Sequence, residues 1–337
     1  MATDNKEMTH VRDVPKQDSL MAGTRALTAR EIWVRLLLYP SHTLPTAAAP
    51  VLVGIGLTVR DHIFAPIPIL IGFLASWLIH VGGVFNDNYQ LLRRHPNVSE
   101  HPELLEALQA GTLTFAGLRN AILVCFLLVA LVGPYLLSIG GTSALVIGLV
   151  GVASGYLYAG GPQPYVKHGL ADPVFFAMFG IVAVVGTYYI QWAALHNMAS
   201  HGLDAMLQLP WDIFLIGLPV GALVTNVMLV DDIRDRHFDA EKGWCTFAVR
   251  FGLSGIRKEY LALTVLAYLL PLVFWLWLGC SAWIFLPLLT LPLAYKIWRA
   301  VSTLDQTKDL LMMSPAASYL SLIYSALLAV GVALPIH

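Results

Sequence analysis

Residues 230–246 read VDDIRDRHFDAEKGWCT and directly follow an apolar segment. Asp231, Asp235 and Asp239 are spaced four residues apart, so on a helix their carboxylates lie on one face. Like charges at this spacing repel by roughly 0.2–0.5 kcal/mol per pair on an exposed helix. The stretch therefore predicts compensating positive charge. Three basic residues in it can supply part of that charge: Arg234, Arg236 and Lys242.

A divalent ion can supply the rest. Mg²⁺ suits this role, because it is held by one or two carboxylates together with substrate phosphates and keeps several waters. The alternative interpretation is a solvated acidic helix end in a cytoplasmic loop. Ionisable clusters beside membrane helices are usually functional, which favours the metal site.

The composition indicates a polytopic membrane protein. The chain has 337 residues, of which 57% are hydrophobic and 12% are charged, whereas soluble domains carry about 25% charged residues. The net charge of −1 and the three cysteines indicate neither a nucleic-acid partner nor a disulfide framework. Residues 1–26 are polar and are expected to form a flexible cytoplasmic tail, and residues 27–337 a single transmembrane domain.

The apolar pattern predicts an all-α fold. Residues 28–31 read TARE, a capping box that is expected to start the first helix. Nine apolar segments of spanning length follow, at about 33–59, 65–92, 113–138, 142–160, 173–195, 210–232, 258–279, 281–300 and 315–335.

The distribution of positive charge predicts the orientation of these segments. With the N-terminus inside, only Arg60 of the 20 Lys and Arg residues falls on the outer side. We therefore expect an integral membrane protein with its N-terminus inside and its C-terminus outside.

Two inner loops resemble each other and follow the second and sixth spans. Each begins at a polar helix end and leads to a Gly–Thr element, at residues 111–114 and 243–246. This weak internal repeat predicts two four-helix-like bundles that present matching loops to one cytoplasmic-facing cavity.

The first of these loops carries Asn86, Asp87 and Gln90, which offer oxygen ligands at the end of an apolar helix. His80 and Asn86 lie deep enough to need polar partners. Interhelical hydrogen bonding is the alternative to a ligand role for these side chains.

A third inner loop, residues 156–168, contains two glycines and two prolines and is expected to be tightly shaped. Its Lys167 is a candidate contact for a phosphate, or else an anchor at the inner membrane face. Carboxylates, amides and basic groups at one end of a helical bundle suit a magnesium–diphosphate site. A diphosphate with a lipid-soluble body is an isoprenyl diphosphate.

These residues resemble the UbiA superfamily of intramembrane prenyltransferases over nearly the whole chain. The second motif of its menaquinone branch reads Asn-Asn-x-Arg-Asp-x-x-x-Asp-x-x-x-Gly-x-x-Thr. Here Arg234, Asp235, Asp239, Gly243 and Thr246 match it. The stretches at residues 155–162, 186–191 and 111–114 also resemble the 1,4-dihydroxy-2-naphthoate polyprenyltransferases more than the hydroxybenzoate enzymes.

The first motif of that branch, Asn-x-x-Asn-Asp-x-x-Asp, is degenerate in this chain. Gly83 replaces its first Asn, Gln90 replaces its last Asp, and Arg94 occupies a position that is often acidic in relatives. Conversely, Asp231 and Asp232 occupy the Asn-Asn of the second motif. The first half-site has lost negative charge and the second has gained it.

The resemblance implies Mg²⁺-dependent transfer of a prenyl group from a polyprenyl diphosphate to a dihydroxynaphthoate-like aromatic acceptor in lipoquinone biosynthesis. It implies the catalytic residues Asp235, Asp239, Asn86 and Asp87, with Asp231 as a further metal ligand. It implies substrate contacts from Lys167, Arg234, Tyr156 and Tyr158. Two alternatives stay open: a terpene cyclase of the same superfamily, and a catalytically degenerate lipid- or quinone-binding protein.

Overall fold

A computed structural model describes residues 28–31, 33, 43–95, 102–196, 202–304, 310 and 312–334, and these contain helices but no strand. The predicted tail at residues 1–26 lies outside this range. The capping box is confirmed, because the Thr28 amide donates to Glu31 Oε2 at 2.8 Å and the Glu31 amide donates to Thr28 Oγ1 at 3.3 Å.

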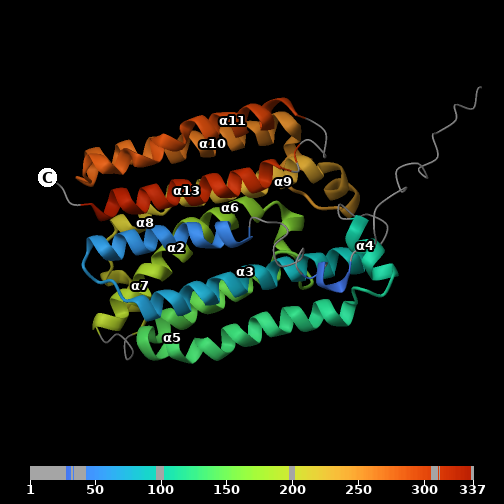
Figure 1. Cartoon of the computed structure of the whole chain (residues 1–337), viewed down its shortest axis with the longest axis horizontal. Helices are drawn as coiled ribbons and strands as arrows, with labels where there is room; N and C mark the ends of the chain where they lie inside the picture. Colours follow the sequence, from blue (N-terminus) through green and yellow to red (C-terminus); the bar gives the residue numbers. More distant parts are fainter. Residues whose placement is uncertain are drawn as a thin grey trace, which may run out of the picture.

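The helices lie side by side along the long axis of the molecule (Figure 1). The first half of the chain forms α2 (Thr43–Arg60), α3 (Pro66–Arg94), α4 (Pro102–Gln109), α5 (Phe115–Leu157), η2 (Tyr165–His168), α6 (Ala171–Ala177), η3 (Met178–Val182) and α7 (Ala183–His196). The second half forms η5 (Leu203–Gln208), α8 (Asp212–Ile216), α9 (Leu218–Lys242), α10 (Phe247–Trp277), η6 (Ala282–Thr290), α11 (Leu291–Thr303) and α13 (Met313–Ala333).

Seven helical segments in the described chain are long and apolar enough to cross a membrane. They are Pro66–Arg94, Phe115–Leu157, Ala171–His196, Asp212–Lys242, Phe247–Trp277, Ala282–Thr303 and Met313–Ala333, and the shorter Leu44–Arg60 is also apolar. The all-helical membrane fold is therefore confirmed, while the number of nine spans stays a prediction.

Helix α5 is broken at Gly141, where φ is 54° and ψ is −149°. Both halves of α5 contact neighbouring residues of α3: an added Cβ on Gly82 would lie 3.2 Å from Cys125, and one on Gly83 would lie 3.2 Å from the Gly155 oxygen. In a straight helix, residues 125 and 155 would be about 45 Å apart. The chain therefore folds back at Gly141, between the predicted spans 113–138 and 142–160.

Helix α9 is the most enclosed of the candidate spans, since 83% of its apolar window is buried. It packs against α10 and α13 on one side and against α6 and η3 on another. Gly180 and Gly221 bring η3 and α9 together, because an added Cβ on Gly221 would lie 2.8 Å from the Gly180 Cα. The acidic end of α9 is enclosed as well, since Asp232, Asp235 and Asp239 are buried.

Candidate active site

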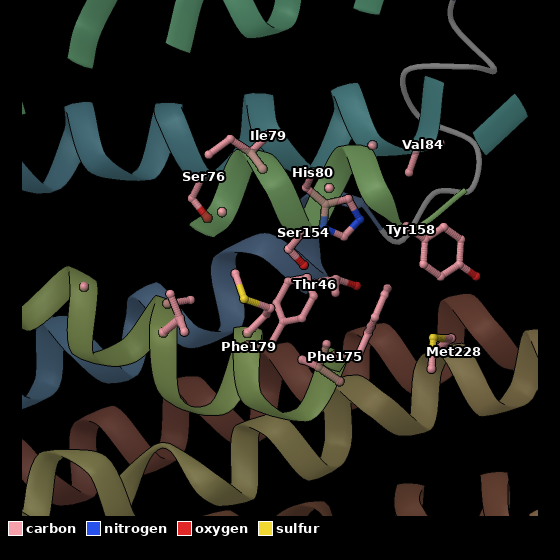
Figure 2. Close-up of a pocket in the computed structure, with 18 of the residues that line it drawn as sticks. Thr46, Ser76, Ile79, His80, Val84, Ser154, Tyr158, Phe175, Phe179 and Met228 are labelled. Carbon is pink, nitrogen blue, oxygen red and sulfur yellow. The ribbon is translucent and has the colours of Figure 1, made fainter. Parts of the chain in front are cut away.

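A cavity of about 360 Å³ runs between α3, the second half of α5, α6 with η3 and α7, and α9. Figure 2 shows His80 and Val84 of α3, Ser154 of α5, Phe179 of η3 and Met228 of α9 around this space. Most of the lining is apolar. The described lining contains five carboxylates, which belong to Asp87, Asp231, Asp232, Asp235 and Asp239.

Four of these carboxylates come from the last three turns of α9. Arg234 compensates two of them: its Nη1 lies 2.6 Å from Asp231 Oδ1, and its Nε donates to Asp235 Oδ1 at 2.7 Å. A second contact joins Arg234 Nη2 to Asp235 Oδ2. Ser314 of α13 also donates to Asp231 Oδ2 at 3.1 Å. The predicted compensation by Arg234 is confirmed.

Asp239 lies in the last turn of α9, where Lys242 and Thr246 contact its carboxylate. Lys242 Nζ lies 3.0 Å from Asp239 Oδ1 and 4.1 Å from the centre of the Trp244 ring, and Thr246 Oγ1 donates to Asp239 Oδ2 at 3.4 Å. Gly243 ends the helix with φ at 72°, a left-handed conformation that glycine adopts most readily. The Gly and Thr of the motif therefore position Asp239.

The first motif faces this acidic cluster through Asp87, which lines the cavity from α3. Asn86 points elsewhere: its Nδ2 donates to the carbonyl of Tyr156 at 2.8 Å, and Gln90 Nε2 donates to Asn86 Oδ1 at 3.4 Å. Asn86 thus makes the interhelical hydrogen bond that was the alternative to a ligand role.

Arg94 supports the same loop as Asn86. Its Nη1 donates to the Ala159 carbonyl at 3.3 Å, and its Nη2 donates to the Gly161 carbonyl at 3.0 Å. An added Cβ on Gly160 would lie 2.5 Å from the Tyr156 oxygen. The degenerate end of the first motif therefore holds the loop after α5 in shape.

Basic groups gather beside this end of the cavity. His95 follows α3 directly, and burial together with the nearby cations Lys242, Lys167 and Arg94 lowers the pKa of its imidazole. Three cations therefore lie close to the C-terminal end of α3, beside the first motif.

Aromatic side chains line the wall between the two motifs. The Tyr158 ring stands edge-on to Tyr165 and Trp244 and is tilted against Phe175, with ring centres 5.6–6.4 Å apart. Burial raises the pKa of Tyr165 to about 12, so its hydroxyl stays protonated and donates to the Ser154 carbonyl at 3.0 Å. Such faces can stabilise a developing carbocation.

The residues at the acidic end fit a hard, oxygen-preferring cation. Asp232 Oδ2 is buried and has no hydrogen-bond partner among the residues with described structure, and the other lining ligands are carboxylates. Among all residues that the structure describes, no three His, Cys, Asp or Glu side chains converge to hold a metal by themselves. Mg²⁺ does not require such a set, because substrate phosphates complete its coordination.

The structure brings together six of the residues identified from the sequence, which line one cavity: Asp87, Tyr158, Asp231, Arg234, Asp235 and Asp239. Its described lining does not include Asn86, Tyr156 or Lys167. Asp232 and Trp244 are among the lining residues that were not predicted as part of the site. Both lie within the quoted stretch, which is the signal that could have identified them.

Comparison with known proteins finds a match to the model of the UbiA prenyltransferase family over residues 47–323. A 1,4-dihydroxy-2-naphthoate octaprenyltransferase of Mycobacterium leprae is 27% identical, with 80% of this chain and 85% of that protein covered. Proteins of the same name from Escherichia coli and Bacillus subtilis are 26% and 24% identical over 77% and 86% of this chain, and over 82% and 89% of their own lengths.

Solved structures share the fold. The apo structure of a UbiA homologue from Aeropyrum pernix K1 has a TM-score of 0.62 at 18% identity, with 86% of this chain and 96% of the other covered. A UbiA homologue from Archaeoglobus fulgidus bound to GPP and Mg²⁺ has a TM-score of 0.55 at 14% identity, with 88% and 99% covered.

Proposed function

The chain belongs to the UbiA prenyltransferase family, and on that premise we propose that it transfers a prenyl group from a polyprenyl diphosphate to 1,4-dihydroxy-2-naphthoate or a closely similar acceptor. The observation that carries this proposal is one cavity with carboxylates from α3 and α9 at one end and apolar walls along the rest. The names of the relatives support the acceptor.

The acidic end would hold Mg²⁺ and the diphosphate. Asp87, Asp235 and Asp239 are the proposed ligands, with Asp231 and Asp232 beside them and Asn86 in a supporting role. When bound, Mg²⁺ neutralises the diphosphate and makes it a better leaving group. A homologue with the same fold binds GPP with Mg²⁺, which supports this cofactor.

The chain's own residues would then control the reacting carbon. The apolar walls exclude water from the allylic cation that forms when the C1–O bond breaks. The face of Tyr158 would stabilise that cation, while Arg234, and Lys167 from beside the cavity, would contact the phosphates. The ring carbon that bears the acceptor carboxylate forms the new C–C bond, and carbon dioxide and diphosphate leave.

The arrangement in the membrane is part of the same proposal. The break at Gly141 supports two spans within α5, and the short apolar α2 supports a further one. We propose nine spans in two bundles, with the acidic end on the cytoplasmic side of a bacterial membrane. In this arrangement the diphosphate group of the donor lies at the cytoplasmic end of the cavity and its apolar tail lies within the membrane.

The test is release of diphosphate by purified protein with a long-chain prenyl diphosphate, with and without 1,4-dihydroxy-2-naphthoate and with Mg²⁺ or EDTA. Release that needs both metal and acceptor, with formation of a prenylated naphthol, is the expected result. Metal-dependent release without acceptor would instead identify a cyclase. No release under any condition would identify a lipid- or quinone-binding protein.

A further inference from the structure

The cavity is much longer than the acidic site needs. Its lining on α3 runs from Pro68 to Leu91, a length of about 35 Å along a helix. All of the lining carboxylates lie at one end of it. Since an isoprene unit contains four carbon–carbon bonds of about 1.5 Å each and advances about 5 Å, the far part could take several units of a tail.

Glycines recur along one wall of this cavity. The face of α5 that lines the cavity includes Gly148, Gly151 and Gly155 at helical spacing. An added Cβ would lie 3.3 Å from the Ile79 side chain at Gly151 and 3.2 Å from the Ile79 oxygen at Gly155. At Gly148 it would meet nothing within 4 Å, although Gly148 lines the cavity.

We propose that Gly148 is a specificity-determining position, whose missing side chain leaves the passage open for the distal units of a long prenyl tail. This inference rests on the proposed function and extends it to the length of the donor. It needs no rearrangement of the protein, because a larger side chain at this position enters the cavity rather than the packing.

The position of Gly148 sets the expected cut-off. Gly155 lies next to Gly83, and Asp87 is one turn beyond Gly83 toward the acidic end. Gly148 is seven residues from Gly155 in the opposite direction. The axial distance from Asp87 to Gly148 is therefore about 16 Å, the length of about three isoprene units at four bonds of 1.5 Å each.

The test compares Gly148→Phe with the matched control Gly133→Phe. Gly133 also lies inside helical α5 with open space around its Cβ, but the described cavity lining does not include it. Neither change costs helix propensity. Each variant is assayed with a series of diphosphates from geranyl diphosphate, which has two isoprene units, to a donor that has eight.

For Gly148→Phe, we expect the kcat/KM ratio of long to short donor to fall by about 10- to 200-fold, the range in which pocket shape discriminates. Gly133→Phe should keep the wild-type ratio. Ala144→Phe, one turn further from the carboxylates, should accept a tail about one unit longer than Gly148→Phe does, since one turn rises about 5.4 Å.

Binding gives a second readout that does not need turnover, namely the rise in melting temperature that each diphosphate causes with Mg²⁺. We expect Gly148→Phe to lose this rise for the long donor alone. If it keeps the wild-type preference in both assays, the inference is overturned while the proposed function stands. If neither diphosphate is turned over or stabilises the wild type, the proposed function fails and the inference with it.

Discussion

At the scale of single residues, Asp235 is the strongest candidate ligand. Its side chain is 9% exposed and both of its oxygens contact Arg234, so the carboxylate is fixed where the cavity begins. Asp235→Asn keeps the shape of the side chain and removes the charge. We expect turnover to fall at least about 100-fold, the upper range for weakened metal ligation, while the protein still purifies as a folded monodisperse species.

The control for this variant is Asp204→Asn in η5, an acid that the described lining does not include. Prenyl transfer should be unchanged in the control. Equal turnover in wild type and Asp235→Asn would remove Asp235 from the site.

Gly83 shows why the degenerate motif is not repaired by restoring the family residue. An added Cβ would lie 3.2 Å from the Gly155 oxygen and 3.4 Å from its Cα, so an asparagine would push α3 and α5 apart. Overpacking of this kind costs about 1–3 kcal/mol. Gly83→Asn should therefore lower the thermal stability, and a melting temperature at or above that of the wild type would contradict the close helix contact.

The sequence predicted which charged groups lie together better than it predicted which partners the polar side chains contact. The four-residue spacing correctly brought Asp231, Asp235 and Asp239 to one face, and the basic neighbours Arg234 and Lys242 do compensate them. The amide of Asn86 donates to the Tyr156 carbonyl instead. That partner lies 70 residues away, and spacing within one helix cannot show which distant backbone atom a buried amide will reach.

At the scale of elements, the return of the chain within α5 depends on Gly141. Its combination of φ 54° and ψ −149° is strongly disfavoured for residues with a Cβ and costs them about 1–3 kcal/mol. Gly141→Ala should lower the melting temperature. Gly133→Ala, at a helical position with open space, should leave it unchanged or raise it. Equal effects of the two changes would argue against the break.

A second element-scale prediction concerns the end of the helices opposite the acidic site. Arg60 Nη1 lies 2.5 Å from Asp212 Oδ2, and Arg60 Nε lies 2.7 Å from Asp61 Oδ1. Tyr188 of α7 donates to Asp61 Oδ2 at 2.7 Å. One guanidinium therefore joins the end of α2 to α8, and Arg60→Met should cost about 2–3 kcal/mol of stability.

This cluster also predicts a pH dependence. Burial alone would raise the pKa of Asp61, but the hydrogen bonds from Arg60 and Tyr188 outweigh it and lower the pKa below 3.8. The stability that Asp61 contributes is therefore complete above pH 3.8 and is lost as the pH falls through the lower folded-state value. In Arg60→Met, the melting temperature should fall less steeply with acidification than in the wild type.

Element boundaries were predicted less well than element identity. The apolar pattern began the seventh span at residue 258, whereas α10 begins at Phe247 and bends at Gly252, where φ is 68°. Hydropathy detects only the lipid-facing part of a helix, and residues 253–259 include three charged side chains. The first turn of α10 begins at the loop that carries Thr246, whose carbonyl accepts from the Arg250 amide. Hydropathy averaged over a window does not detect such a start.

At the scale of the whole molecule, two cysteines at opposite ends of the helices test the proposed orientation. Cys245 is exposed beside the acidic end of α9, and Cys280 is partly buried in the turn after α10. Burial raises the pKa of the Cys280 thiol, so this thiol is the less reactive of the two.

With the acidic end inside, a membrane-impermeant maleimide should label Cys245 in inverted vesicles and not in right-side-out vesicles. Cys245→Ser supplies the background from the two remaining cysteines. Labelling of Cys245 from the outer side would contradict the proposed orientation and would place the acidic site on the outer side of the membrane.

Because Cys245 lies between cavity-lining Trp244 and Thr246, which donates to Asp239, a long-chain prenyl diphosphate with Mg²⁺ should also slow its labelling in inverted vesicles. This protection would link the orientation of the chain to the position of the site.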